Sequence, residues 1–135
     1  MNDHETPQTP PPPPASNGGG FSNPNARQWG MFLHFSQLTN LIVPGLGFVA
    51  PIVIWQIKKD EFAELDSHGK MVTNWLISLV IYILAASVAA FATCGLGVIL
   101  YLPVALVAIA FPIVGGIKAN NGILWKYPLT ITFIK

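Results

Sequence analysis

Charged residues are scarce in this chain. Lys, Arg, Asp and Glu make up 10% of its 135 residues, against about 25% in an ordinary soluble domain. Apolar residues reach 52%, so too few polar side chains remain to cover a soluble domain of this size. The net charge of +1 provides no basic patch, and we therefore expect no nucleic-acid partner.

Cysteine and clustered metal ligands are scarce as well. Cys94 is the only cysteine, so no intramolecular disulfide can form, and its apolar context predicts a small packing residue. His4, His34 and His68 are scattered and belong to no zinc-binding spacing. Because no acid, base or nucleophile set falls at a catalytic spacing, we expect no enzyme activity, no cofactor and no metal site.

The first 25 residues are rich in proline and glycine and contain almost no large apolar side chain. Such a segment cannot bury enough surface to offset its chain entropy, so it is predicted to be disordered. The chain therefore divides into a tail, residues 1–25, and a helical transmembrane domain, residues 26–135.

Residues 28–57 contain no formal charge and would form a helix about 45 Å long, against a hydrocarbon core of about 30 Å. Pro44, Gly45 and Gly47 interrupt this block near its middle. The preferred interpretation is a hairpin of two short helices, 28–43 and 46–57, whose second arm is short enough to be re-entrant. A single long, kinked span is the alternative, and it would give three spans in total.

Residues 71–117 form a second uncharged block, long enough for two spans. Its break at Gly95-Leu96-Gly97 repeats the Gly-Leu-Gly of the first block and predicts spans at 70–93 and 97–118. The predicted fold is thus an all-α membrane protein, a bundle of about four helices arranged as two hairpins.

A polar stripe marks the first arm, where His34, Gln37 and Asn40 recur at three-residue spacing. Polar groups inside a membrane are costly and are often functional, which favours a hydrophilic path or a substrate contact. A hydrogen-bonded seam between helices is the other interpretation.

The polar stretch between the blocks, residues 55–75, holds most of the charges. Asp66 or Ser67 is predicted to cap the next helix, with His68 close by, because such side chains accept hydrogen bonds from unpaired amides. Asn74 is a candidate tie between this loop and the bundle. Near the other end of the chain, residues 129–134 alternate weakly like a strand, although a course along the membrane surface is the preferred prediction.

Lysines and aromatic residues predict the orientation. Both Gly-Leu-Gly turns are uncharged, whereas the cations gather at the opposite face, which the positive-inside bias makes cytoplasmic. We expect a multi-pass protein of the bacterial plasma membrane with the central loop, the C-terminal segment and the N-terminus inside. The predicted orientation and interface anchors are Trp29, Trp55, Lys58, Lys59, Trp75, Lys118, Trp125 and Tyr127.

Three groups of residues together resemble a known family. They are Trp55 with Lys58-Lys59-Asp60, then residues 66–70 with Asn74-Trp75, and finally residues 117–122 with 127–131. In combination, over about 26–135, they resemble a domain-of-unknown-function family of small bacterial membrane proteins. That family is distantly related to the twenty-kilodalton subunit of the chloroplast inner-envelope import translocon. The resemblance implies a helical bundle and a link to protein translocation.

Two functions follow from these observations. The first is a structural or interaction component of the inner membrane, linked to translocation or membrane-complex assembly, with membrane-protein partners or a homo-oligomer in the bilayer. The alternative is an oligomeric small channel or transporter, which rests on the polar stripe and on helices interrupted by proline and glycine.

Overall fold

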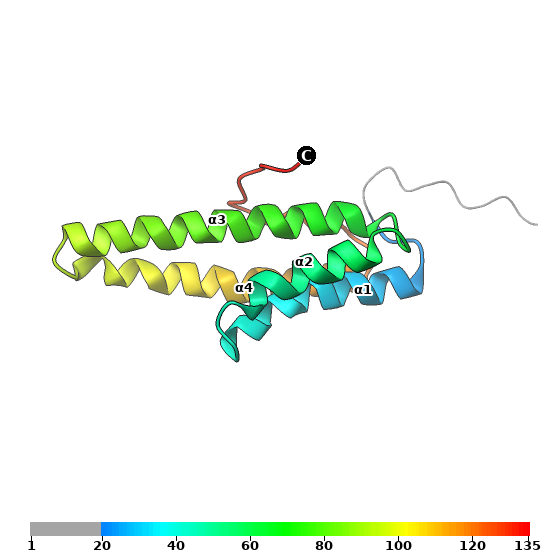
Figure 1. Cartoon of the computed structure of the whole chain (residues 1–135), viewed down its shortest axis with the longest axis horizontal. Coiled ribbons are helices and arrows are strands. Elements are labelled where there is room, and N and C mark those ends of the chain that lie inside the picture. Colours follow the sequence, from blue (N-terminus) through cyan, green and yellow to red (C-terminus); the bar gives the residue numbers. More distant parts are fainter. Residues whose placement is uncertain (1–19) are drawn as a thin grey trace, which may run out of the picture.

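The computed structural model describes residues 20–135, and these residues form helices and turns without a strand (Figure 1). Two helical hairpins pack side by side, as the sequence predicted. Their elements, in chain order, are α1 Pro24–Phe35, the 3-10 helix η1 Ser36–Leu41, α2 Leu46–Lys58, α3 Leu65–Ala92, the 3-10 helix η2 Leu96–Leu100 and α4 Tyr101–Asn120.

The first hairpin joins α1 and η1 to α2. Asn23 caps α1 by accepting a hydrogen bond from the amide of Asn25, and Pro24 occupies the first turn, where its missing N–H costs nothing. At the open end the Lys58 ammonium lies 4.5 Å from the centre of the Trp29 ring. Because the two ends of residues 28–57 meet, this block is a hairpin and not one long, kinked helix.

Both hairpin turns use Gly-Leu-Gly in the same way. Gly45 and Gly95 have φ values of 92° and 101°, a left-handed conformation that glycine adopts without strain. The second glycine of each motif sits where a Cβ would collide with the preceding arm, for example 2.6 Å from the carbonyl carbon of Ala89 at Gly97. A polar side chain completes each turn: Asn40 accepts from the Gly45 amide, and Thr93 accepts from the Gly97 amide.

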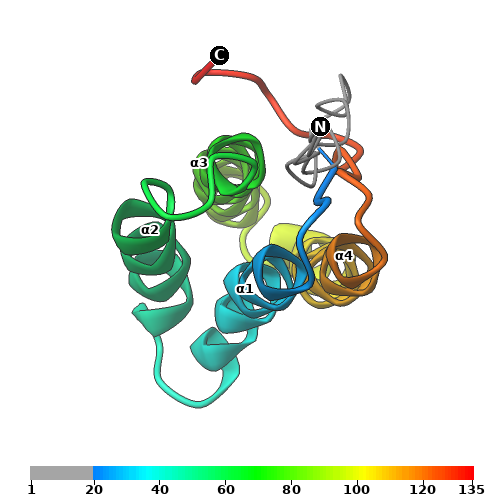
Figure 2. The same ribbon diagram turned by 90° about the vertical axis from the view of Figure 1, so that its right-hand side faces the viewer.

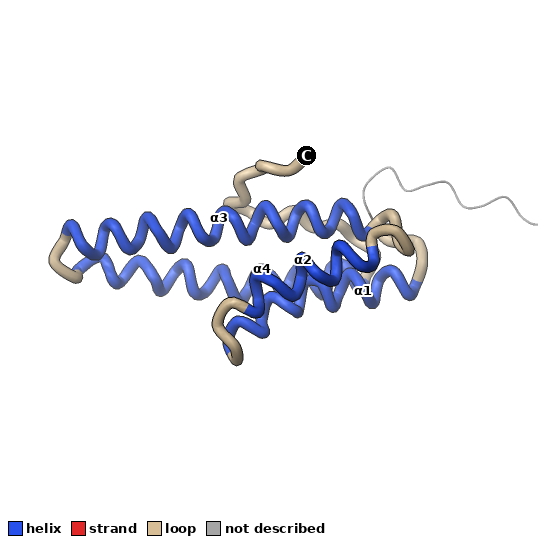
Figure 3. Tube along the Cα trace, viewed as in Figure 1, coloured by secondary structure: helices blue, strands red, loops and turns tan. Residues whose placement is uncertain are grey.

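The two hairpins differ in length. The 28 residues of α3 extend about 42 Å, whereas the 13 residues of α2 extend about 20 Å. The first hairpin therefore covers only part of the second (Figures 1 and 3). Residues on both sides of its turn, Asn40 and Gly47 among them, line a small pocket together with Leu79 and Ala108. Within the described residues, only Leu65–Ala92 and Leu96–Asn120 are both long and apolar enough to cross a membrane.

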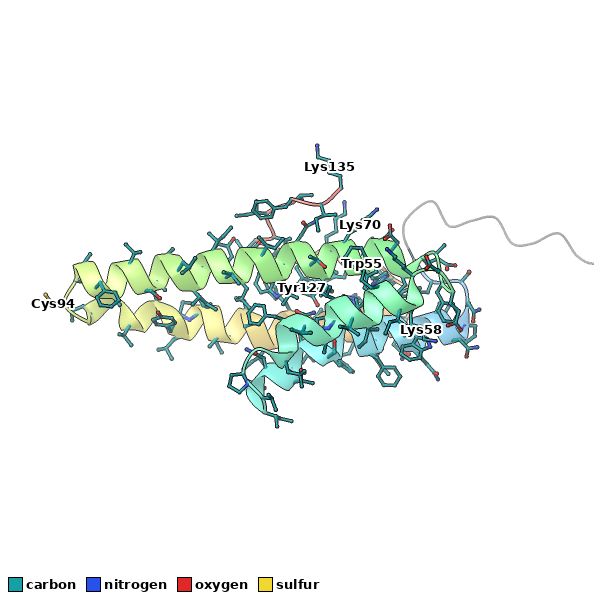
Figure 4. The ribbon with its side chains drawn as sticks, in the orientation of Figure 1. Trp55, Lys58, Lys70, Cys94, Tyr127 and Lys135 are labelled. Carbon is teal, nitrogen blue, oxygen red and sulfur yellow. The ribbon has the colours of Figure 1, made fainter. Side chains whose placement is uncertain are left out.

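The part of the α3–α4 hairpin beyond the first hairpin is largely apolar surface. Phe91 and Leu96, next to the turn, are 88% and 82% exposed, and Val88 and Leu106 are 68% and 69% exposed. So much contiguous apolar surface belongs in lipid and not in water. The lysines lie toward the opposite end of the bundle, as Lys58 and Lys70 show in Figure 4.

Residues 123–135 form neither helix nor strand. They leave the end of α4 and cross to α3, as Figure 2 shows. Asn74 holds them there: its Nδ2 donates to the Ile134 carbonyl over 2.8 Å, and its Oδ1 accepts from the amides of Phe133 and Ile134. Residues 129–134 therefore do not form a strand. Asn74 holds the C-terminal segment against α3, and it does not hold the central loop as predicted.

The packed body begins before residue 26. Phe21, which falls within the predicted tail, is 3% exposed and stacks on the His68 ring with the ring centres 4.1 Å apart. Its amide also donates to the Gly122 carbonyl. The rest of the predicted disordered tail, residues 1–19, lies outside the described residues.

Candidate functional site: a buried polar network

The structure gathers four polar side chains where α1, α3 and the C-terminal segment meet. His34 of α1 is 1% exposed, and its Nδ1 lies 2.6 Å from the Tyr127 hydroxyl oxygen. Its other nitrogen, Nε2, lies 3.1 Å from Nδ1 of His68, which is fully buried in α3. One imidazole therefore links three separate parts of the chain.

The Gln37 amide adds a further hydrogen bond to the Tyr127 hydroxyl. Its Nε2 donates to the Tyr127 hydroxyl over 3.2 Å, so the hydroxyl hydrogen is available for His34 Nδ1. With the hydroxyl as donor, His34 carries its own hydrogen on Nε2 and donates it to His68 Nδ1. In this assignment, made from the network, the His34 imidazole is neutral.

Tyr127 remains a phenol at neutral pH. Burial raises the pKa of its hydroxyl above the ordinary value, although the hydrogen bond from Gln37 acts in the opposite direction. Removing water disfavours the charged phenolate, which explains the sign of this shift. The hydroxyl therefore keeps the proton that it donates to His34.

Glycine in α4 makes room for the network. A Cβ on Gly115 would lie 2.6 Å from the Tyr127 hydroxyl and 2.7 Å from His34 Nδ1. On the other side, the Tyr127 ring packs against Phe111 and Trp75, with ring centres 5.6 and 5.7 Å away. The polar atoms are thus enclosed by helix backbone and aromatic rings.

Chemically, the four side chains that the structure brings together here are imidazoles, a phenol and an amide, and none of them is a carboxylate. No group of three or more His, Cys, Asp or Glu residues within 20–135 could hold a metal ion. What the geometry does supply is attachment: it joins the first hairpin and the C-terminal segment to α3. Buried polar groups that are fully hydrogen-bonded in this way favour one packing arrangement over others.

Only part of the predicted polar stripe enters this network. His34 and Gln37 take part in it, whereas Asn40 is exposed and caps the Gly45 amide instead. The interpretation as a hydrogen-bonded seam therefore applies to His34 and Gln37 and not to Asn40. Tyr127, predicted as a surface anchor, is 3% exposed and lies at the centre of the network.

The predicted start of the third helix is also corrected. α3 begins at Leu65, and no side chain caps its first amides. Asp66 instead accepts a hydrogen bond from Trp55 Nε1 and forms an ion pair with Lys70, whose Nζ is 2.6 Å away. His68, expected near a cap, points into the bundle, and Ser67 borders a pocket beside the C-terminal segment.

The predicted anchors differ in how far they are buried within the protein. Trp29 and Trp55 each have a lysine over the ring, Lys58 and Lys59 respectively, at the open end of the first hairpin. Trp75 is fully buried and packs on Phe111, so it is a core residue. Of the other two, Trp125 is half-buried among aromatic rings and Lys118 is half-buried in the last turn of α4.

The fold and the apolar surface together define a small helical membrane protein built from two unequal hairpins. Comparison with known families identifies the family to which this membrane protein belongs. A profile matches residues 25–134, and the chain belongs to MamF/MmsF, the magnetosome magnetite crystal formation protein family. Neither the curated proteins nor the solved structures include a match to the chain.

This match overturns the import-translocon resemblance. It extends over nearly the whole region, about 26–135, to which that resemblance was assigned. The resemblance inferred from residues 58–60, 66–75 and 117–131 is therefore wrong. The expected link to protein translocation rested only on that resemblance and is withdrawn with it.

Proposed function

We propose that this protein is a non-enzymatic structural component of the membrane that surrounds a growing magnetite crystal. The observation that carries this proposal is the family match over residues 25–134. The closed polar network supports a structural role, because its side chains are occupied by contacts within the chain. They leave no obvious donor set for a substrate.

The same network argues against the channel alternative. That alternative rested on His34, Gln37 and Asn40 lining a hydrophilic path. His34 and Gln37 are instead buried against Tyr127 and His68, and Asn40 completes a turn. We therefore propose that the protein acts through contacts with the bilayer and with other membrane proteins or copies of itself, and not through transport.

In this proposal α3 and the η2–α4 segment cross the bilayer, and the shorter first hairpin enters it part of the way. The end of the bundle that carries Lys58, Lys70 and Lys118 faces the cytoplasm, following the positive-inside bias. The turn at Cys94 then faces the opposite side of the membrane.

A complementation experiment tests this function. A magnetite-forming bacterium that lacks its own genes of this family would receive the present chain, and crystal size would be measured by electron microscopy. We expect larger or more regular crystals than in the empty-vector strain. Crystals unchanged from that strain, although membrane fractionation shows the protein inserted, would contradict the proposal.

A matched variant separates a specific role from mere occupation of the membrane. Tyr127→Phe removes the hydroxyl that holds the network together, whereas Tyr101→Phe removes a hydroxyl bonded to Ser87 near the far turn. We expect the first change to reduce complementation more than the second at equal protein level.

A further inference from the structure

A pocket of about 420 Å³ lies between the first turns of α3 and the C-terminal segment. Lys70, Lys126 and Lys135 line it, and no Asp or Glu side chain from residues 20–135 does. Figure 4 shows Lys70 and Lys135 on the same side of the α3 ribbon. Ser67 and Thr132 add hydroxyl groups to the same lining. The pocket thus presents cations and hydrogen-bond donors together.

The charge of this pocket is only partly balanced. Lys70 is paired with Asp66, but Lys126 and Lys135 are exposed and form no ion pair within residues 20–135. A main-chain carboxylate at residue 135 would offset one further charge and still leave the site positive. Such a site favours an anion, and lysine ammonium groups are common partners of phosphate.

The position of the pocket along the membrane normal indicates the source of that anion. A hydrocarbon core of about 30 Å corresponds to about 20 helical residues. Counted along α3 from the turn at Cys94, the core ends near residue 74, and Lys70 lies one turn beyond. Counted along η2 and α4 from Leu96, it ends near Gly115, just before Lys118. The pocket therefore lies at the level of lipid headgroups.

A separate apolar groove lies closer to the bilayer centre. It encloses about 380 Å³ between α3 and α4, with Tyr82, Ala86, Pro103 and Val107 among its lining residues. Leu129 also lines the groove, and the next residue, Thr130, lines the lysine pocket. A charged pocket followed by an apolar groove matches the two chemical parts of a phospholipid.

We propose that this pocket binds the phosphate of an anionic glycerophospholipid, with one acyl chain lying along the groove. Basic pockets at the ends of membrane helices bind such headgroups elsewhere. The proposal requires only that the protein is inserted in a membrane, so it stands or fails separately from the role in crystal formation.

The test uses the full chain in nanodiscs that contain equal amounts of phosphatidylglycerol and phosphatidylcholine, with retained lipid counted by native mass spectrometry. We expect retained phosphatidylglycerol to exceed phosphatidylcholine severalfold. Lys126→Gln is expected to lower this preference about fivefold, since one lysine near a lipid surface contributes about 1 kcal/mol. Lys126 is exposed, so its replacement leaves the buried core intact.

Lys118→Gln is the matched control, because it removes the same charge from the end of α4 outside the pocket lining. A preference that falls equally in both variants would overturn the proposal, since diffuse surface charge would then explain it. The absence of any preference in the unmodified protein would overturn it as well.

Soluble phosphate distinguishes the second possible source of the anion. Glycerol 3-phosphate or inorganic phosphate is added at constant ionic strength, with chloride as the reference. We expect no loss of bound phosphatidylglycerol, because neither competitor carries an acyl chain to fill the groove. Displacement at low millimolar concentration would mean that the pocket is a site for soluble anions, and the lipid assignment would be wrong.

Discussion

The hydroxyl of Tyr127 lies 2.6 Å from Nδ1 of His34, although 93 residues separate them in the chain. This contact fastens the C-terminal segment to the first hairpin, while His34 also reaches α3 through His68. Loss of this contact should therefore weaken the packing among all three parts of the bundle.

Tyr127→Phe should destabilise the protein by about 1–3 kcal/mol, because it leaves the buried Gln37 amide and His34 Nδ1 without a shared partner. Unfolding in mixed micelles, followed by circular dichroism, measures this change. Tyr101→Phe is the control and should cost less, because the Tyr101–Ser87 pair is only partly buried. Equal losses would contradict a special role for the network.

Alkaline pH should destabilise the folded protein through the same residue. The folded-state pKa of Tyr127 is raised above its unfolded value of about 10, so the folded state holds its proton more tightly. Stability from this group is complete below the unfolded pKa and falls as pH rises beyond it. Comparing the free energy of unfolding at pH 8 and pH 11 should show a smaller decrease in Tyr127→Phe than in the unmodified protein.

Gly115→Ala should disturb the network by overpacking. The new methyl group would lie within 2.7 Å of both Tyr127 and His34, and such crowding costs about 1–3 kcal/mol. Trp75 and Trp125 pack on the Tyr127 ring, so tryptophan emission should shift.

Gly95→Ala provides the comparison for this change. Its Cβ would meet nothing within 4 Å, although the left-handed φ adds strain. This variant should lose stability without a shift in tryptophan emission, and a shift of equal size in both variants would refute the crowding argument.

Asn74→Ala should release the end of the C-terminal segment. Its side chain makes three hydrogen bonds to the backbone of residues 133 and 134, so those amides should exchange with deuterium at least tenfold faster in the variant. Thr73→Ala changes the neighbouring position and should leave the exchange unaltered. Fast exchange in the unmodified protein would show that the tie does not hold.

Cys94 offers a test of orientation. It is exposed at the turn between α3 and α4, opposite the end that carries Lys58 (Figure 4). The chain is produced in a bacterium that forms no magnetosome vesicles, so that it lies in the plasma membrane, and a membrane-impermeant maleimide should then label Cys94 in intact spheroplasts. In a Cys94→Ser, Glu61→Cys variant it should label only after lysis, and the reverse pattern would place the lysines outside.

The helices were predictable from sequence because their signals are local. Two uncharged blocks, each broken by Gly-Leu-Gly, sufficed for two hairpins, and the positive φ of Gly45 and Gly95 gives the breaks their physical reason. The start of α3 was placed too late because Leu65 and Asp66 stand beside a charged stretch, which resembles a loop when only composition is considered.

The buried polar network is harder to predict from the sequence than the helices are. The spacing of His34 and Gln37 identified one face of α1, but their partner Tyr127 is supplied by a non-helical segment that carries no periodic signal. Trp75 was expected at the interface for a related reason. Its position beside a polar loop resembles an anchor, and only the packing of Phe111 and Tyr127 against its ring shows that it is buried.

The unequal lengths of the hairpins have a mechanical consequence. Near the lysines, α1 and α2 lie beside α3 and α4, whereas only the α3–α4 hairpin continues to the turn at Cys94 (Figure 1). The bundle is therefore wider at the end with the lysines, and in the proposed insertion the protein takes up more area in that leaflet than in the other. Many copies inserted in the same direction would bend the bilayer so that the side with the lysines becomes convex, as on the outer surface of a small vesicle.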